Sequence, residues 1–245
     1  MCGIFAVLSN DTNYLSSDIL KNNFMKGKSR GPDNSKYEII NSNLSFGFHR
    51  LSINGIDTIS NQPLSRNGIY LICNGEIYNY KQIYSDLNYT PKTNSDCEAI
   101  ICLYEKYGID DTLQNLDGVF SFVLYDSNIG QGFIARDPYG VRPLYYGIVP
   151  STSIIIFSSL LKQISELTNN TTNFQAGSYV TFNIYKDSNY EVLLHKKYTT
   201  FNYHNNYSMT SYGLQQCYNI IYESLFNAVK KRVITMETDF ACLLS

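Results

Sequence analysis

The sequence predicts an α+β fold in which two stacked, mostly antiparallel sheets carry helices on their outer faces. Short stretches rich in Val, Ile, Phe and Tyr recur between residues 4 and 184, separated by Gly, Asn, Asp or Pro, as in a chain of many short strands. Two helical segments lie together between residues 80 and 107. Runs of strands with the helices grouped between them are typical of packed α+β layers.

The N-terminal part is expected to begin with a strand and a helix. Residues 4–8 are an apolar run almost at the first residue, so we expect them to lie in a sheet. Ser16-Ser17-Asp18 offers an N-cap for a helix over residues 18–27, which ends near Gly27. Further strands are expected at residues 37–40, 44–48, 69–73, 119–125, 133–135, 144–149, 154–157 and 179–184.

The two central helices are expected at residues 80–88 and from Ser95 to about Tyr107. In the second, apolar residues recur at helical spacing on one face. These residues are Ala99, Ile100, Leu103 and Tyr107. That face should pack against a sheet.

The C-terminal part suggests a second unit. Residues 166–177 and 198–211 are rich in Asn, Thr, Tyr and Ser and are interpreted as loop or linker. Apolar residues then recur at helical spacing at Leu214, Tyr218, Ile221, Leu225 and Val229, before the apolar run 240–244. We therefore expect a main domain over residues 2–195, a linker over 196–211, and over 212–245 the start of an α/β domain that is truncated.

Composition narrows the classes of function. The net charge of −2 is spread without a basic run, which gives no support for nucleic acid or a membrane surface as partner. The N-terminal residues lack the basic region, apolar run and cleavage site of a secretory signal, so a cytoplasmic location and reduced cysteines are expected. The six cysteines form no C-x-x-C pair, and His49, His195 and His204 lack metal-ligand spacing, so no metal site is predicted.

Cys2 has a distinctive position in the chain. Its small side chain makes removal of Met1 chemically easy, which would leave a thiol and a free α-amine on one residue. With reference pKa values of about 8.5 and about 7.7–8.0, the amine can serve as base for its own thiol. On position alone, the start of a buried strand is the favoured interpretation of Cys2.

Five motifs appear together in order. They are Met1-Cys2-Gly3-Ile4-Phe5-Ala6, Arg30-Gly31-Pro32-Asp33, His49-Arg50-Leu51-Ser52-Ile53, Asn74-Gly75-Glu76-Ile77-Tyr78-Asn79 and the run 135–145 that begins Ala135-Arg136-Asp137-Pro138. Together they closely resemble the class II glutamine amidotransferase domain of asparagine synthetases over about residues 2–160. That family has the N-terminal-nucleophile hydrolase fold, an αββα sandwich.

The resemblance implies roles for specific residues. Cys2 would be the nucleophile, and Asn74 and Gly75 would supply the oxyanion hole. Arg50 would bind the α-carboxylate of glutamine, for which its planar fork is suited, and Asp96 would bind the α-ammonium. Further substrate contacts are implied for the turn Leu51-Ser52-Ile53-Asn54 and for Glu76.

Simpler readings remain open for each position. Arg50 could be a surface arginine, and Asn-Gly at 74–75 is by itself a good tight turn. Asp96 lies in Ser95-Asp96-Cys97-Glu98, a capping-box spacing at a helix start, where an acid is explained by the helix dipole.

The function that follows from the resemblance is hydrolysis of the L-glutamine side-chain amide through a Cys2 thioester. No cofactor is expected for this step. In the family, ammonia passes through a channel to a C-terminal synthetase domain that uses ATP and Mg²⁺ to convert aspartate to asparagine, and a homodimer is compatible with this arrangement. Two alternatives stay open: a glutaminase that feeds another acceptor, which the residues after Ser245 would discriminate, and a catalytically idle ligand-binding relative that retains Met1.

Overall fold

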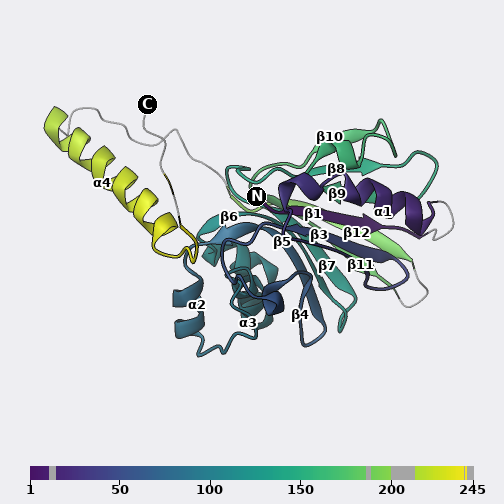
Figure 1. The fold of residues 1–245 in the computed structure, drawn as a ribbon, viewed down its shortest axis with the longest axis horizontal. Helices are drawn as coiled ribbons and strands as arrows, with labels where there is room; N and C mark the ends of the chain where they lie inside the picture. The colour runs from purple at the N-terminus through teal and green to yellow at the C-terminus, as the bar shows by residue number, and fades with distance from the viewer. Residues whose placement is uncertain (11–14, 186–188, 200–212, 240, 242–245) are drawn as a thin grey trace.

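The computed structural model describes residues 1–10, 15–185, 189–199, 213–239 and 241. Its body is a sandwich of two six-stranded sheets, and the pairings between described strands are antiparallel (Figure 1). The first sheet has the order β10 (Thr171–Asn173), β8 (Tyr145–Ile148), β9 (Ile155–Ser158), β1 (Gly3–Leu8), β3 (Leu44–Arg50), β2 (Asn34–Ile39). The second has the order β12 (Tyr190–Lys197), β11 (Ser178–Ile184), β7 (Gln131–Arg136), β6 (Gly118–Asp126), β5 (Ile69–Ile77), β4 (Leu64–Arg66).

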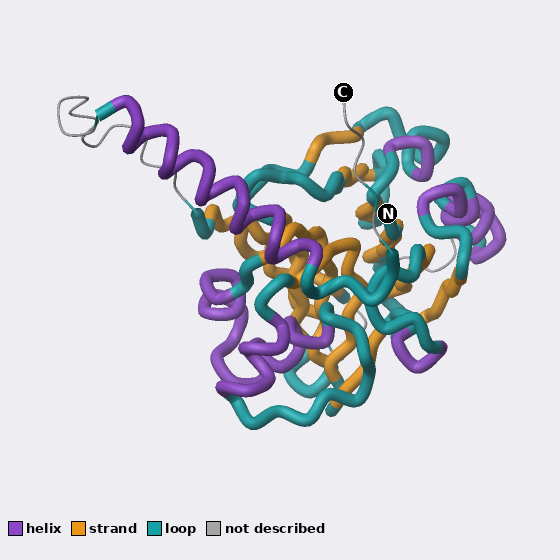
Figure 2. Tube along the Cα trace, turned by 60° about the vertical axis from the view of Figure 1, so that its left-hand side comes forward, coloured by secondary structure: helices purple, strands orange, loops and turns teal. Residues whose placement is uncertain are grey.

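Helices cover the outer faces of both sheets (Figure 2). On the first sheet lies α1 (Ser17–Met25), whose Phe24 packs with Phe5 and Val7. On the second lie α2 (Tyr80–Asp86) and α3 (Glu98–Asn115), and α3 packs Ile100 and Leu103 against the sheet. Three short 3₁₀ turns are η1 (Lys28–Arg30), η2 (Thr58–Ser60) and η3 (Leu161–Gln163). The four layers confirm the predicted αββα sandwich.

The central strands are apolar on both faces because both faces are buried. In β1, Ile4 and Ala6 belong to the core between the sheets, whereas Phe5 and Val7 face the layer that contains α1. Successive side chains of a strand point to opposite faces, so a strand covered on both sides is a continuous apolar run in sequence. This burial explains why β1 and β5 are easily predicted.

The predicted strands and helices are present, with three additions. β4, β10 and β12 were not expected, and all three lie at the edges of their sheets. β10 falls inside residues 166–177, which we expected to be loop. Its sequence Thr-Thr-Asn has no apolar pattern, and most of β12 is exposed. Edge strands need less apolar surface, so their sequences carry a weaker signal.

The second central helix begins later and runs further than predicted. It starts at Glu98 with Cys97 as N-cap, and it continues to Asn115 across a kink at Gly108, where φ is 75°. Beyond the kink, Ile109 and Leu113 are buried in the same core as the first part of the helix. This burial extends the element past Tyr107.

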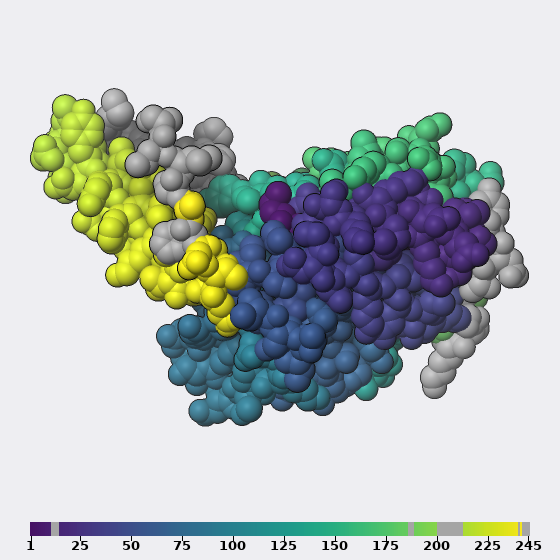
Figure 3. Space-filling view, in the orientation of Figure 1, coloured from purple at the N-terminus to yellow at the C-terminus, as the bar shows by residue number. Residues whose placement is uncertain are grey.

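The predicted C-terminal helix is α4 (Leu214–Val233), which projects from the sandwich (Figures 1 and 3). Its end returns to the body, where Lys231 Nζ lies 2.7 Å from Asp117 Oδ1. The predicted linker 196–211 is described only as far as residue 199, and β12 extends to Lys197 within it. Of the apolar run 240–244, only Ala241 lies within the described residues. The division into two domains therefore stays a prediction.

Candidate active site

A pocket lies where the start of β1, the turn after β3, the middle of β5 and the loop before α3 meet. Its empty volume, which includes open solvent at the mouth, is about 460 Å³. The lining residues are Met1, Cys2, Phe48, Arg50, Leu51, Ile53, Asn54, Ser60, Gln62, Cys73, Asn74, Gly75, Glu76, Ser95, Asp96, Cys97 and Arg142. Every site residue that the sequence indicates is among them except Ser52.

Cys2 lies immediately before β1, and its thiol contacts the turn after β3. The Leu51 N–H donates to Cys2 Sγ at 3.3 Å, and Sγ lies 3.4 Å from the Leu51 carbonyl oxygen. Arg30 Nε donates to the Cys2 carbonyl at 2.7 Å and fixes the backbone. Burial raises the pKa of the Cys2 thiol, and the Leu51 N–H partly opposes this. Burial also lowers the pKa of the terminal amine, which here belongs to Met1.

Asn74-Gly75 is not a tight turn. Both residues lie inside β5 and pair with Ser121 and Phe120 of β6. The pairing with β6 continues to Ile77. This strand pairing overrides the local preference of Asn-Gly for a turn. A Cβ atom on Gly75 would lie 2.7 Å from the Val119 carbonyl oxygen, so the close packing of the two strands requires glycine at this position.

The pocket edge of β5 presents hydrogen-bond donors. Asn74 is buried, and its Nδ2 has no partner among the described residues. Cys73 N donates to Gln62 Oε1 at 2.6 Å, and Ile77 N donates to Asp96 Oδ2 at 2.7 Å. Alternate backbone N–H groups of a strand point to the same edge, so Gly75 N points between these two, toward the pocket.

Arg50 is 5% exposed, and its guanidinium is held by the segment that follows β3. Nη1 donates to the Asp57 carbonyl at 2.7 Å and to Asn61 Oδ1 at 2.6 Å, and Nη2 donates to the Gly55 carbonyl. Arginine carries five N–H donors in one plane, so these bonds fix the plane without using every donor. The buried position excludes the reading of Arg50 as a surface arginine.

Asp96 is buried and lies before α3. Its carboxylate accepts from Ile77 N, as above. Burial raises the pKa of Asp96 to about 6, which the Ile77 N–H partly opposes. The predicted capping box does not form, because the Glu98 carboxylate accepts from Lys92 N and Thr93 N instead of turning back to Ser95 N. The capping interpretation of this spacing is therefore wrong.

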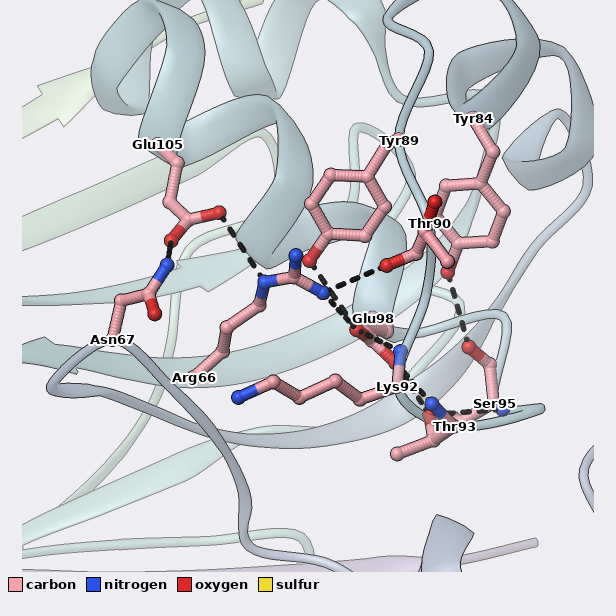
Figure 4. A network of polar contacts seen from close by, with 10 residues as sticks. All are labelled: Arg66, Asn67, Tyr84, Tyr89, Thr90, Lys92, Thr93, Ser95, Glu98 and Glu105. Atoms are coloured by element: carbon pink, nitrogen blue, oxygen red, sulfur yellow. Dashed lines mark hydrogen bonds and ion pairs between the residues drawn. The ribbon is translucent and has the colours of Figure 1, made fainter.

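The Glu98 carboxylate holds the loop that leads to Asp96 (Figure 4). Besides Lys92 N, it accepts from Thr93 N and Thr93 Oγ1, each at 2.7 Å. Arg66 Nη1 lies 3.3 Å from Glu98 Oε1 and donates at 2.9 Å to the Thr90 carbonyl. A buried carboxylate with this many donors fixes the path of the loop, and with it the position of Ser95 and Asp96.

Several lining residues were missed in the sequence. Gln62 bonds both backbone groups of Cys73, with Nε2 donating to the Cys73 carbonyl at 3.2 Å. Arg142 forms an ion pair with Glu76 across the pocket. Gln62 lies in an irregular loop with no pattern around it, whereas Arg142 lies within the motif 135–145 and could have been proposed from the resemblance.

Among the residues that the structure describes, no group of three or more His, Cys, Asp and Glu side chains could hold a metal ion. None of the described helices has the length and apolar composition needed to cross a membrane.

Comparison with known proteins agrees with the motifs. Residues 1–215 match the family described as glutamine amidotransferase domain. The glutamine-hydrolysing asparagine synthetase of Mesocricetus auratus is 38% identical over 180 residues, which cover 71% of this chain and 31% of the relative. The corresponding enzyme of Mus musculus is 33% identical over 265 residues, covering 100% of this chain and 46% of the relative.

Solved structures support the fold. The glutamine phosphoribosylpyrophosphate amidotransferase of B. subtilis superposes with a TM-score of 0.62 at 16% identity, covering 82% of this chain and 50% of that one. At this identity the likeness shows the fold alone, and it confirms the N-terminal-nucleophile hydrolase architecture. The chain spans less than half the length of the two asparagine synthetases described above. From the family match over most of its length, this chain belongs to the glutamine amidotransferase domain family, with glutamine-hydrolysing asparagine synthetases among its relatives.

Proposed function

We propose that Cys2, after removal of Met1, attacks the side-chain amide of L-glutamine and releases ammonia. The observation that carries this proposal is the pairing of a thiol with an unsatisfied donor in one pocket: Cys2 Sγ and the buried, unpartnered Asn74 Nδ2. A buried donor without a partner is costly, so its retention supports a role in binding an oxygen that arrives with the substrate.

The first half of the reaction forms a thioester. Cys2 Sγ attacks the amide carbon of glutamine, and the thiol proton passes to the α-amine of the same residue. The amide oxygen becomes an oxyanion, for which Asn74 Nδ2 and Gly75 N are the proposed donors. When the tetrahedral intermediate collapses, the C–N bond breaks, and the leaving nitrogen takes the proton from the α-amine and departs as ammonia.

The second half releases glutamate. Water attacks the thioester carbon, the α-amine accepts a proton from that water, and the same donors hold the oxyanion. The C–S bond then breaks, and the leaving thiolate takes the proton back from the α-ammonium, which restores both the thiol and the free amine. Burial raises the pKa of the Cys2 thiol, so the thiol is protonated at rest and needs a local base, for which the α-amine freed by removal of Met1 is the proposed group.

Selection of glutamine is proposed to rest on its two charges. Arg50 would bind the α-carboxylate with its remaining donors, and Asp96 would bind the α-ammonium. Leu51, Ile53, Asn54 and Glu76 would contact the substrate from the pocket wall. The Ser52 N–H donates to Asp33 Oδ2 at 2.7 Å, so we assign Ser52 to shaping the turn.

The acceptor of the ammonia is proposed to be aspartate, because the relatives named above are asparagine synthetases. This requires a C-terminal synthetase domain that receives ammonia through a channel and uses ATP and Mg²⁺, beginning within residues 212–245. No step of the glutaminase cycle above uses either of them. A cytoplasmic location and a homodimer belong to the same proposal.

The test is glutaminase activity of the parent protein beside Cys2→Ala and Cys2→Ser. In both variants the rate of hydrolysis is expected to fall to background, because no thioester can form without the Cys2 sulfur. Cys217→Ser, on α4, is the matched control and should retain full activity. Hydrolysis that persists in Cys2→Ala, or a parent protein without glutaminase activity, would contradict the proposal.

A further inference from the structure

The segment that follows α4 reaches the rim of the glutamine pocket. The Gly55 N–H donates to Glu237 Oε2 at 3.0 Å, across 182 positions of the chain. Figure 3 shows the yellow atoms at the end of α4 against the blue atoms of the body. The turn that follows Arg50, the proposed carboxylate-binding residue, is therefore held from outside the sandwich.

Gly55 is a sensitive point at which to hold this turn. Its carbonyl accepts from Arg50 Nη2, so a shift of Gly55 would change the plane of the guanidinium. Its φ is +60°, and a Cβ atom there would lie 2.7 Å from Asn94 C and 2.8 Å from Ser95 N. Gly55 thus packs directly against the loop that leads to Asp96, and both proposed charge-binding residues depend on its position.

A second set of contacts fixes the end of α4 to residues next to β5. Lys231 Nζ lies 2.7 Å and 2.8 Å from the two carboxylate oxygens of Asp117, and the Arg232 guanidinium lies 4.9 Å from the ring centroid of Tyr78. Tyr78 N in turn donates to the Asp117 carbonyl at 2.8 Å. Tyr78 follows Ile77, whose N–H holds Asp96. The end of α4 and the segment after it are therefore held beside β5 and beside the turn that follows Arg50.

We propose that Glu237 is a positioning residue that sets the affinity of the site for glutamine, by holding Gly55 and through it Arg50. This inference rests on the proposed function of the pocket. Glu237 does not line the pocket and touches no reacting atom, so its loss should weaken binding and leave the chemical step unchanged. The position of α4 is by this route coupled to glutamine affinity.

The test compares Glu237→Ala with Glu237→Gln, which keeps an acceptor oxygen for Gly55 N. A single hydrogen bond of this kind supports about a three- to tenfold change in affinity, whether or not its acceptor is charged. Glu237→Ala is expected to raise KM by that factor with kcat within about twofold, and Glu237→Gln should stay near the parent. Glu223→Ala, on the exposed surface of α4, is the matched control and should change neither value.

A binding measurement separates this inference from the proposed function. In the Cys2→Ala background, which is not expected to turn over, calorimetry with L-glutamine should give a Kd about three- to tenfold weaker when Glu237→Ala is added. This result would support the role of Glu237 even if hydrolysis were absent. An unchanged Kd and KM in Glu237→Ala, a loss confined to kcat, or an equal defect in Glu237→Gln would overturn it.

Discussion

The two walls of the pocket are built differently. The wall of β5 is a strand that pairs with β6 on one edge and is bonded by Gln62 and Asp96 on the other. The opposite wall is the irregular turn from Arg50 to Gly55, held by side chains and by Glu237. Donors on a strand are held more rigidly than groups on a turn. We therefore expect the strand wall to govern the chemical step and the turn wall to govern binding.

The largest effect is expected on the strand wall, from Asn74→Ala. Loss of one oxyanion donor typically lowers kcat by about 10²–10³, and KM should change little because the donor acts mainly on the transition state. Steady-state kinetics beside glutamine binding in the Cys2→Ala background would check both. If Asn74→Ala raised KM and left kcat intact, the distinction between the walls would be lost.

An intermediate effect is expected from Asp96, which accepts a hydrogen bond from Ile77 N of the strand wall and is the proposed partner of the glutamine α-ammonium. With the pKa of Asp96 at about 6, its carboxylate becomes protonated as the pH falls through that value and can no longer attract an ammonium. The kcat/KM of the parent should fall below about pH 6, and in Asp96→Asn this limb should disappear while KM at pH 7 rises about tenfold or more. A parent profile that stays flat between pH 7 and 5 would contradict this assignment.

The ionised Asp96 carboxylate that is proposed to bind the substrate should also lower the free energy of unfolding. Its folded pKa is raised, so the ionised carboxylate destabilises the folded state at pH 7, and this cost disappears as the pH falls below about 4. Asp96→Asn should therefore raise the free energy of unfolding at pH 7 by on the order of 1–3 kcal/mol and leave it unchanged at pH 4. Denaturation at the two pH values checks the sign.

The smallest effect is expected from Glu98→Gln, behind the loop that carries Asp96. The amide keeps one acceptor oxygen but loses charge-assisted bonds to Thr93 and Arg66, so a loss of about 1–2 kcal/mol in unfolding free energy is expected. Glu105→Gln is the matched control in the same network (Figure 4), since Glu105 is more exposed and lies 3.9 Å from Arg66 Nε. Equal losses in the two variants would refute a special role for Glu98.

The parts of the fold that could be predicted are those that follow from a local pattern in the sequence. Strands buried on both faces, such as β1 and β5, appear as apolar runs, and α1 has a side-chain N-cap in which Ser16 Oγ accepts from Ile19 N. The edge strands β10 and β12 were missed because pairing on one edge requires no apolar pattern. The start of α3 was misplaced because Glu98 bonds a loop instead of closing a capping box.

The sequence indicated which residues line the pocket, but not the contacts that hold them in place. The structure brings Cys2, Arg50 and Asn74, which the motifs indicated, into one pocket with Asp96. The local interpretation of Asn74-Gly75 as a turn was wrong, because pairing with β6 decides its conformation. The supporting residues Gln62 and Glu237 lie 11 and 182 positions from Cys73 and Gly55, the residues they hold. Such contacts depend on the tertiary fold, and no local pattern indicates them.

The central claim is that Cys2 becomes the N-terminal residue and acts as the nucleophile. Its most direct test is intact-mass analysis of the purified protein before and after treatment with a diazoketone analogue of glutamine, followed by peptide mapping. We predict a mass that lacks Met1 and a single adduct on the Cys2 sulfur, with protection by L-glutamine. A retained Met1, or an adduct on Cys73 or Cys97 with Cys2 unmodified, would contradict the account.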